Sequence, residues 1–196
     1  MGLNTVQTYV TWNYHSQVRG IYDFEGSRDL IGFIKAVAAE GLLLNLRAGP
    51  YVCGETDQGG LPAYLFNTPG INSANDLRTN NTAYMSAVAE WWSVLLPMVA
   101  PYTIQAGKGG PIAMVQLENE YGSYGNVKDH PADRDYMLQL RALALQYLPT
   151  GTQLYTTDGN DAGYLNGGAV PGIVFATGDG SGPPYAADQI NPPGCE

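Results

Sequence analysis

One stretch of the chain carries both a fold signal and a chemical signal: residues 111–122 read PIAMVQLENEYG. The apolar run from Pro111 to Leu117 is followed at once by Glu118, Asn119 and Glu120. A short apolar run of this kind is typical of a strand buried in a parallel sheet. Polar residues directly after such a strand lie at the carboxyl edge of the sheet, where α/β enzymes hold their active sites. The stretch therefore predicts a buried strand that delivers these three side chains to a functional site.

Strands and helices alternate on both sides of this stretch. Further strands are predicted at Leu3–Val10, Leu42–Leu46, Leu154–Thr157 and Ile173–Ala176. Helical spacing predicts one helix that begins at Ser27 as N-cap and ends at Gly41, one from about Ala83 to Met98, and one marked by Tyr136, Leu140, Leu143 and Tyr147. This alternation implies parallel strands joined by right-handed crossovers. The fold class is therefore α/β.

Two α/β architectures fit the alternation, a (β/α)₈ TIM-type barrel and a doubly wound open sheet, because periodicity alone cannot separate them. Polar clusters follow the strand ends, which favours the barrel. These clusters are WNYH at 12–15, ETD at 55–57, ENE at 118–120, Asp158 and Asp179. No Gly-rich phosphate loop follows a predicted strand, so nucleotide binding is disfavoured. About five strands in 196 residues fall short of a complete barrel of about 250 residues. We therefore expect residues 1–196 to be one partial domain, an incomplete barrel.

Composition excludes several classes of partner. Nine Lys and Arg against 18 Asp and Glu give a net charge of -9, which argues against nucleic-acid backbones and anionic membrane surfaces. No apolar run approaches the roughly 18 to 20 residues needed to span a bilayer, and the first residues, MGLN, do not resemble a signal peptide. His15 and His130 are not at metal-ligand spacing, so we expect no metal. No residue pattern indicates any other cofactor.

The Asn119-Glu120 pair suits glycoside hydrolysis. A glutamic acid can protonate the leaving oxygen, and an asparagine can hydrogen-bond the sugar 2-hydroxyl. Strand alternation predicts that Glu118 and Glu120 share one face, so it does not choose between them. The alternative is that both carboxylates are structural partners of Arg47 or of backbone amides.

Eight segments, spread in order from residue 2 to residue 159, resemble the family 35 glycoside hydrolases, the β-galactosidases. They are GLNTVQTYV at 2–10, WNYH at 12–15, YDF at 22–24, LRAGPYVCGE at 46–55, GGLPAYL at 59–65, GGPI at 109–112, ENEYG at 118–122 and YTTDG at 155–159. The resemblance implies a (β/α)₈ catalytic domain that cleaves terminal β-galactosyl residues with retention of configuration. The substrate would be a β-galactoside, and the family suggests a secreted, lysosomal or vacuolar protein.

The resemblance also implies roles for individual residues. Glu120 is the expected general acid/base, and Asn119 is its partner on the 2-hydroxyl. The expected galactose contacts are Tyr9 and Glu55, with Cys53 and Gly54 lining the pocket. Glu118 is expected to support the position of the site.

The chain departs from the family pattern at four positions and at both ends. Ser16 stands where Glu is usual, Ala48 where Pro is usual, Gly54 where Ala is usual, and Thr56 where Trp is usual. The Thr56 change removes an aromatic wall. The first barrel strand is expected upstream of Met1.

The family nucleophile is a glutamate on the seventh strand, which is expected beyond Glu196, and Glu196 itself does not follow an apolar strand. The chain alone is thus expected to have little or no turnover. Two alternatives stay open: another two-carboxylate barrel glycosidase of the mannanase or cellulase type, and an inactive sugar-binding remnant. Cys195 is expected to pair with a cysteine outside this chain.

Overall fold

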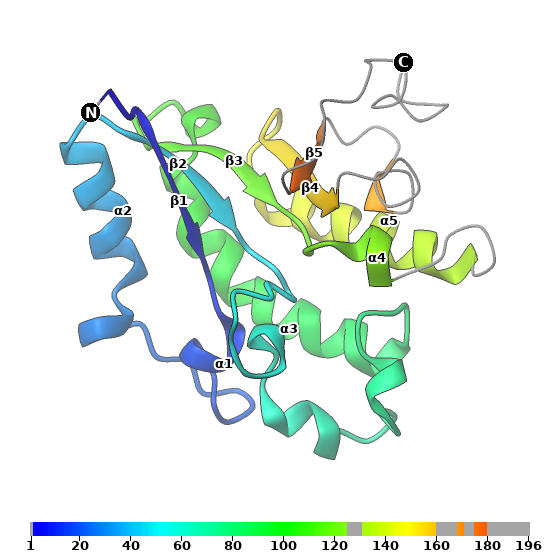
Figure 1. Ribbon diagram of the computed structural model, residues 1–196. Helices are drawn as coiled ribbons and strands as arrows, with labels where there is room; N and C mark the ends of the chain where they lie inside the picture. Colours follow the sequence, from blue (N-terminus) through cyan, green and yellow to red (C-terminus); the bar gives the residue numbers. More distant parts are fainter. Residues whose placement is uncertain (1, 125–130, 160–167, 171–174, 180–196) are drawn as a thin grey trace, which may run out of the picture.

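The computed structural model describes residues 2–124, 131–159, 168–170 and 175–179. Within these residues, five strands form one parallel sheet and lie side by side in sequence order (Figure 1). The strands are β1 Thr5–Tyr9, β2 Leu43–Arg47, β3 Ile112–Gln116, β4 Gln153–Gly159 and β5 Phe175–Asp179. A doubly wound sheet reverses its strand order at a switch point, whereas a barrel does not. The unbroken order therefore agrees with part of a (β/α)₈ barrel.

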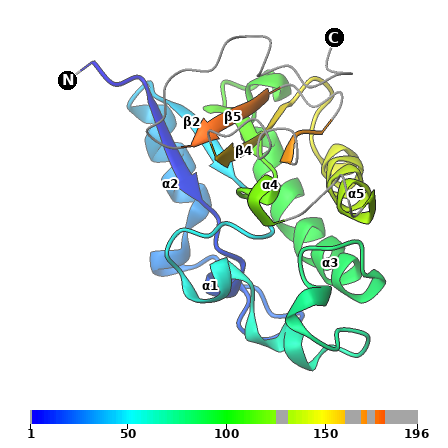
Figure 2. The same cartoon turned by 45° about the vertical axis from the view of Figure 1, so that its right-hand side comes forward.

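The helices cover one face of this curved sheet. The α-helices are α1 Trp12–His15, α2 Leu30–Ala39, α3 Thr82–Val99, α4 Tyr121–Tyr124 and α5 Pro131–Tyr147. Short 3₁₀ helices lie at Gly26–Arg28, Asp57–Gly60, Ala63–Asn67, Ala74–Asp76, Ala100–Tyr102 and Ile104–Ala106. Two views show α2, α3 and α5 around the outside of the strands (Figures 1 and 2). No helix in the described part of the chain is both long and apolar enough to span a bilayer.

The two faces of the sheet differ in polarity. In β2, Leu44 and Leu46 are fully buried in the core that the sheet shares with the helices, whereas the alternate positions hold Asn45 and Arg47. The strand β2 is therefore apolar on the face toward the helices, whereas Asn45 and Arg47 lie on the face toward the barrel interior. The largest fully buried side chains come from strands and helices alike and include Trp12, Trp91, Trp92, Tyr84, Tyr121, Tyr136, Ile34, Leu44 and Leu46.

Two of the residues after β1, Trp12 and His15, belong to the core and not to the site, contrary to the expectation for residues 12–15. The Trp12 indole is 1% exposed and stacks on Trp91 at 6.0 Å between ring centroids. His15 is buried, stacks on Phe24 at 4.6 Å and lies within hydrogen-bond distance of the Asp23 carbonyl through Nδ1. Burial lowers the pKa of His15 below its ordinary value, so the ring packs as a neutral group.

The predicted elements are all present, with bounds that differ by a few residues. Asp29, and not Ser27, caps α2: its Oδ1 accepts from the Gly32 amide at 2.7 Å. The 3₁₀ turn Gly26–Arg28 contains Ser27 and lies before the true start of α2. The spacing of apolar residues does not predict this turn. The last strand begins at Phe175, and the predicted start at 173–174 lies outside the described residues.

The N-cap of α3 provides a test of this packing. The Oδ1 atom of Asn81 accepts hydrogen bonds from the Ala83 amide at 2.9 Å and the Tyr84 amide at 3.0 Å. We expect Asn81→Ala to lower the free energy of unfolding by about 1 kcal/mol, because two helix amides lose their acceptor. Asn81→Asp keeps an acceptor at the same place but, like Asn81→Ala, loses the Nδ2 hydrogen bond to the Gly70 carbonyl, so we expect a smaller loss than in Asn81→Ala. Chemical denaturation measures both, and equal losses in the two variants would contradict the capping role.

Candidate active site

Four side chains lie in one row across the sheet, and three of them, Tyr9, Arg47 and Gln116, are the last residues of their strands. The parallel register pairs Tyr9 with Arg47, Arg47 with Gln116, and Gln116 with Tyr155. Residues in register on parallel strands point to the same face of the sheet. This row therefore forms the inner edge of the site, and the residues that follow β3 continue it.

The chain leaves β3 through a break in regular strand geometry. The Glu118 amide donates to the Gly49 carbonyl beside β2 at 2.8 Å, but the Glu120 amide donates to Thr157 of β4, also at 2.8 Å. In a regular strand, residues two apart have amides that point the same way. Here Glu118 and Glu120 both have positive φ, 59° and 48°. The prediction that these two glutamates share one face is therefore wrong.

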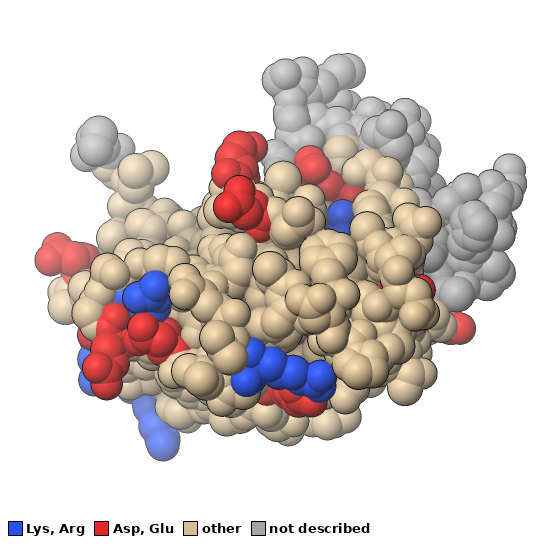
Figure 3. Space-filling view, turned by 90° about the horizontal axis from the view of Figure 1, so that it is seen from below, with Lys and Arg blue, Asp and Glu red and all other residues tan. Residues whose placement is uncertain are grey.

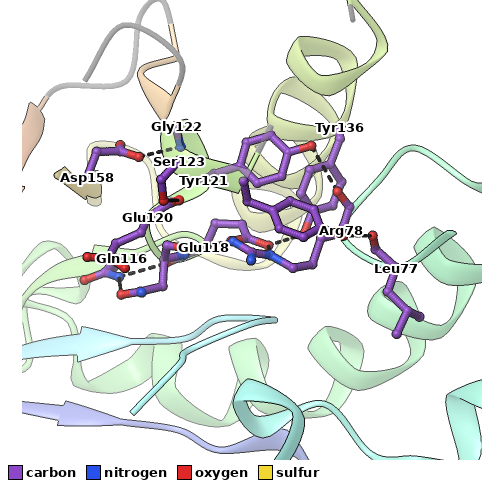
Figure 4. A network of polar contacts seen from close by, with 12 residues as sticks. Leu77, Arg78, Gln116, Glu118, Glu120, Tyr121, Gly122, Ser123, Tyr136 and Asp158 are labelled. Carbon is purple, nitrogen blue, oxygen red and sulfur yellow. Dashed lines mark hydrogen bonds and ion pairs between the residues drawn. The ribbon is translucent and has the colours of Figure 1, made fainter. Parts of the chain in front are cut away.

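Glu118 is buried, and its carboxylate is fully hydrogen-bonded (Figure 4). Arg78 donates to it twice, from Nε at 3.1 Å and from Nη2 at 2.7 Å. The Tyr136 hydroxyl donates at 2.8 Å and the Asn119 amide at 2.9 Å. A carboxylate has about four acceptor positions, so these four bonds occupy the group. This carboxylate is a structural anchor.

Arg78 lies between aromatic rings that hold its guanidinium in place. The Cζ atom lies 3.7 Å from the centroid of the Tyr51 ring and 4.0 Å from that of Tyr124. Its Nη2 also donates to the Asn119 carbonyl at 2.8 Å. The Tyr51 ring occupies the space that a side chain at Gly59 would fill, since a Cβ there would lie 1.9 Å from a ring carbon. Glycine at 59 thus permits the aromatic cover of Arg78.

The Glu118 carboxylate helps to keep Arg78 and Tyr136 protonated. Burial lowers the pKa of the Arg78 guanidinium, but the charge of Glu118 and its hydrogen bonds raise that pKa by more. Burial, and next the charge of Glu118, raise the pKa of Tyr136 well above its ordinary value. Tyr136 is therefore a permanent donor to Glu118.

Arg47 binds neutral partners and not the carboxylates considered as its alternative. Its Nη1 donates to the Tyr9 hydroxyl at 2.9 Å, and its Nη2 donates to Oδ1 of Asn119. The guanidinium also lies over the Tyr9 ring, 4.2 Å from the centroid. Arg47 thereby joins the ends of β1 and β3 at the side chains of Tyr9 and Asn119.

Glu120 differs from Glu118 in its surroundings. Its side chain is half-buried, and none of the described residues is a hydrogen-bond partner of its carboxylate. Its backbone is held on both sides, by the Thr157 carbonyl and by the Ser123 hydroxyl, which donates to the Glu120 carbonyl at 2.8 Å. Glu120 thus combines a fixed backbone with a carboxylate that no described residue engages.

Asp158 of β4 supports the turn that follows Glu120. Its side chain is fully buried, and Oδ1 accepts from the Gly122 amide at 2.6 Å (Figure 4). Burial raises the pKa of Asp158 to about 8. The Gly122 hydrogen bond acts in the opposite direction, and the charges of Glu118 and Glu120 add to the increase. Through the Gly122 hydrogen bond, Asp158 fixes the orientation of the turn that carries Glu120.

The loop after β2 brings the other expected sugar contacts to the same edge. Cys53, Gly54 and Glu55 all have positive φ, of 57°, 58° and 50°. A Cβ at Gly54 would lie 3.7 Å from the Tyr9 ring, so Gly54 lies beside that ring. Thr56, where the family has Trp, donates its hydroxyl to the Cys53 carbonyl at 2.8 Å. The structure therefore places Gly54 beside Tyr9 and leaves Glu55 exposed.

The charges on the loop face are scattered. Figure 3 shows the acidic and basic side chains of the described residues in small groups, some of them side by side, with most of the surface uncharged. Arg19 and Glu90 form such a side-by-side pair. No group of three His, Cys, Asp or Glu in the described ranges could hold a metal ion. His130, Cys195 and Glu196 lie outside the described residues, so the expectations for them stay untested.

Two functional residues are not found by motif reasoning. Arg78 lies in a polar loop with no motif around it, and its one signal is indirect: a carboxylate buried after an apolar strand requires a cation. The role of Arg47 is similarly hidden, because the spacing does not show that its partners are an amide and a phenol.

Comparison with known proteins places this arrangement in a family. Residues 1–191 match the family described as "Glycosyl hydrolases family 35". The chain belongs to this family. "Beta-galactosidase 17" of Arabidopsis thaliana is 42% identical over 201 residues, covering 99% of this chain and 27% of that protein. "Beta-galactosidase" of Homo sapiens is 40% identical over 181 residues, covering 92% and 25%. The chain thus spans about a quarter of the length of these family 35 relatives.

Solved structures confirm the barrel fold of this family 35 chain. An exo-beta-1,4-mannosidase, Op5Man5 from Opitutaceae bacterium strain TAV5, matches with a TM-score of 0.60 at 15% identity, over 79% of this chain and 25% of that one. Endo-glycoceramidase II from Rhodococcus sp. matches with a TM-score of 0.58 at 15% identity, over 93% and 46%. At such identities the likeness concerns the fold alone, which is that of a partial TIM-type barrel.

The buried ion pair generates a prediction about stability. We expect Arg78→Met to lower the free energy of unfolding by about 3 to 5 kcal/mol, because Glu118 is then a buried carboxylate without its cation. Arg19→Met is the matched control, since the pair of Arg19 with Glu90 is 40% and 44% exposed. An exposed pair of this kind contributes about 1 kcal/mol at most. Chemical denaturation measures the free energy of unfolding of both variants. Similar losses would contradict the prediction that the buried Arg78 pair contributes more to stability than the exposed Arg19 pair.

Asp158 generates a prediction about pH. Its pKa is about 8 in the folded chain and about 4 when unfolded. Between these values folding takes up a proton, so the free energy of unfolding falls as pH rises from about 4 to about 8, by at most about 1.4 kcal/mol per pH unit. We expect Asp158→Asn to remove this part of the slope. Denaturation curves across that pH range test it, with Asp57→Asn as the control for losing one carboxylate. An unchanged slope in Asp158→Asn would contradict the assignment.

Proposed function

We propose that residues 1–196 are part of the catalytic domain of a retaining β-galactosidase, with Glu120 as its general acid/base. One observation carries the proposal: the turn after β3 in this family 35 chain holds one glutamate as an anchor and leaves the other unengaged. Glu118 has four hydrogen-bond donors around it. Of these two described glutamates, Glu120 alone is therefore available to donate a proton to a leaving group and later to activate water.

The side chains around Glu120 fit a sugar subsite. Asn119 is adjacent and would hydrogen-bond the 2-hydroxyl, a contact that strengthens in the transition state. Tyr9 is 41% exposed and offers a hydroxyl and a ring face. Cys53, Gly54 and Glu55 would line the same pocket, with Glu55 binding sugar hydroxyls. The proposed substrate is a terminal β-galactoside.

Retention of configuration requires a second carboxylate about 5 to 5.5 Å from the first, which attacks the anomeric carbon. We assign this nucleophile to a barrel strand other than the five described. Glu118 is not that group, because its carboxylate oxygens already accept hydrogen bonds from Arg78, Tyr136 and the Asn119 backbone N–H. The described strands would then supply the acid/base and much of the galactose pocket.

Replacing Glu120 tests the assignment. In the protein expressed from its complete reading frame, we expect Glu120→Gln to lower kcat/KM for an alkyl β-galactoside by about 10²- to 10⁴-fold, because the poor leaving group needs a proton. The loss should be far smaller for a dinitrophenyl β-galactoside, whose phenolate leaves without one. Steady-state kinetics with both substrates measures the difference.

Glu118→Gln is the matched control for this experiment. This substitution weakens the pairing with Arg78. We therefore expect a lower free energy of unfolding, and a loss of kcat/KM that is proportionally similar on both substrates. Equal losses on both substrates in Glu120→Gln would overturn the acid/base role. Aryl β-glucoside and β-mannoside are assayed alongside, and a preference for either, or galactose binding without hydrolysis, would overturn the proposed activity.

A further inference from the structure

Arg47 lies between Tyr9 and Asn119, two of the residues proposed to contact the sugar. It is the last residue of β2, it is 7% exposed, and it is in register with Tyr9 on one side and Gln116 on the other. Its Nη1 donates to the Tyr9 hydroxyl at 2.9 Å, and its Nη2 donates to Oδ1 of Asn119. One buried guanidinium therefore holds both groups.

The chemistry of the guanidinium fixes the orientation of the Asn119 amide. Arginine has five N–H donors, no acceptor, and no neutral form in proteins. Asn119 can satisfy it only with its oxygen, so its NH₂ group must face the other way. Gln116 Nε2 lies 3.5 Å from the same oxygen and favours the same orientation. Among the described residues, Nδ2 of Asn119 has no hydrogen-bond partner.

The same argument applies to the Tyr9 phenol. Because Arg47 can only donate, the Tyr9 oxygen is the acceptor, and the phenolic proton is directed elsewhere. The Arg47 guanidinium also lies 4.2 Å from the Tyr9 ring centroid, which holds the ring beside Gly54. Tyr9 and Asn119 thus both present donors, although each type of side chain can also accept.

We propose that Arg47 is a positioning residue that presents the side-chain NH₂ group of Asn119 as a hydrogen-bond donor to the substrate 2-hydroxyl. The inference rests on the proposed function and adds to it the polarity of the subsite. Substrate hydroxyl oxygens facing Tyr9 and Asn119 are acceptors. Without Arg47 the amide can turn over and present its oxygen, so the 2-hydroxyl contact loses its fixed direction.

Deleting the 2-hydroxyl from the substrate tests the inference. The protein expressed from its complete reading frame is assayed with an aryl β-galactoside and with its 2-deoxy analogue, and each variant is compared with the unmodified protein on each substrate. We expect Arg47→Met to lower kcat/KM for the galactoside by at least about tenfold more than for the 2-deoxy analogue. Any loss that arises through Tyr9, or through general loosening of the site, is shared by both substrates and cancels in this ratio.

Arg47→Lys keeps the experiment informative if Arg47→Met fails to fold. An ammonium group retains the charge but cannot reach two partners with a planar fork, so we expect a smaller selective loss on the galactoside. Arg19→Met, which removes an exposed arginine away from the site, is expected to leave both substrates unaffected. Equal losses on the two substrates, or no loss, in both Arg47 variants would overturn the positioning role. Absence of β-galactosidase activity in the unmodified protein would instead overturn the proposed function on which it rests.

Discussion

The buried ion pair between Arg78 and Glu118 is the interaction on which the candidate site depends. The turn after β3 contains two glutamates with positive φ, a conformation that costs L-residues about 1 to 2 kcal/mol each. Regular strand hydrogen bonds cannot hold such a turn. Together with the backbone bonds to Gly49 and Thr157, the Glu118 carboxylate holds it. This carboxylate accepts hydrogen bonds from Arg78, Tyr136 and the Asn119 backbone amide. The Arg78 guanidinium is in turn held at this position by the rings of Tyr51 and Tyr124, which cover it.

Two buried arginines flank Asn119 and act on different parts of it. Arg78 binds its backbone carbonyl, and Arg47 binds its side-chain oxygen. Arg78 is stable in the interior because it also forms an ion pair with the Glu118 carboxylate. The Arg47 contact uses only the fact that arginine cannot accept a hydrogen bond. Backbone position and amide orientation are therefore fixed by separate contacts, from different segments of the chain.

Local patterns predict the elements of this fold well and the contacts of the site poorly. The apolar run 112–117 is enough to identify β3, and the order of strands and helices indicates a barrel. The alternation of side chains between the two faces of a strand fails to place Glu118 and Glu120 correctly. It assumes a regular strand backbone, whereas both residues have positive φ and interrupt the two-residue repeat. The partners of Glu118 could not be predicted, since Arg78 is 40 residues away and Tyr136 is 18 residues away. Such pairings depend on how loops return to the sheet, which no local spacing encodes.

The two backbone amides of this turn are attached to different neighbours, Glu118 to the β2 side and Glu120 to the β4 side. The loop after β2 carries Cys53, Gly54 and Glu55, whereas the support of Glu120 comes from Thr157 and Asp158. The proposed sugar-binding loop and the proposed acid/base thus have separate mechanical supports. Under the proposed function, substitutions that reshape the loop at 53–57 would change which sugars fit while Glu120 stays in place. A scaffold of this kind would diversify its substrates in evolution without rebuilding its chemistry.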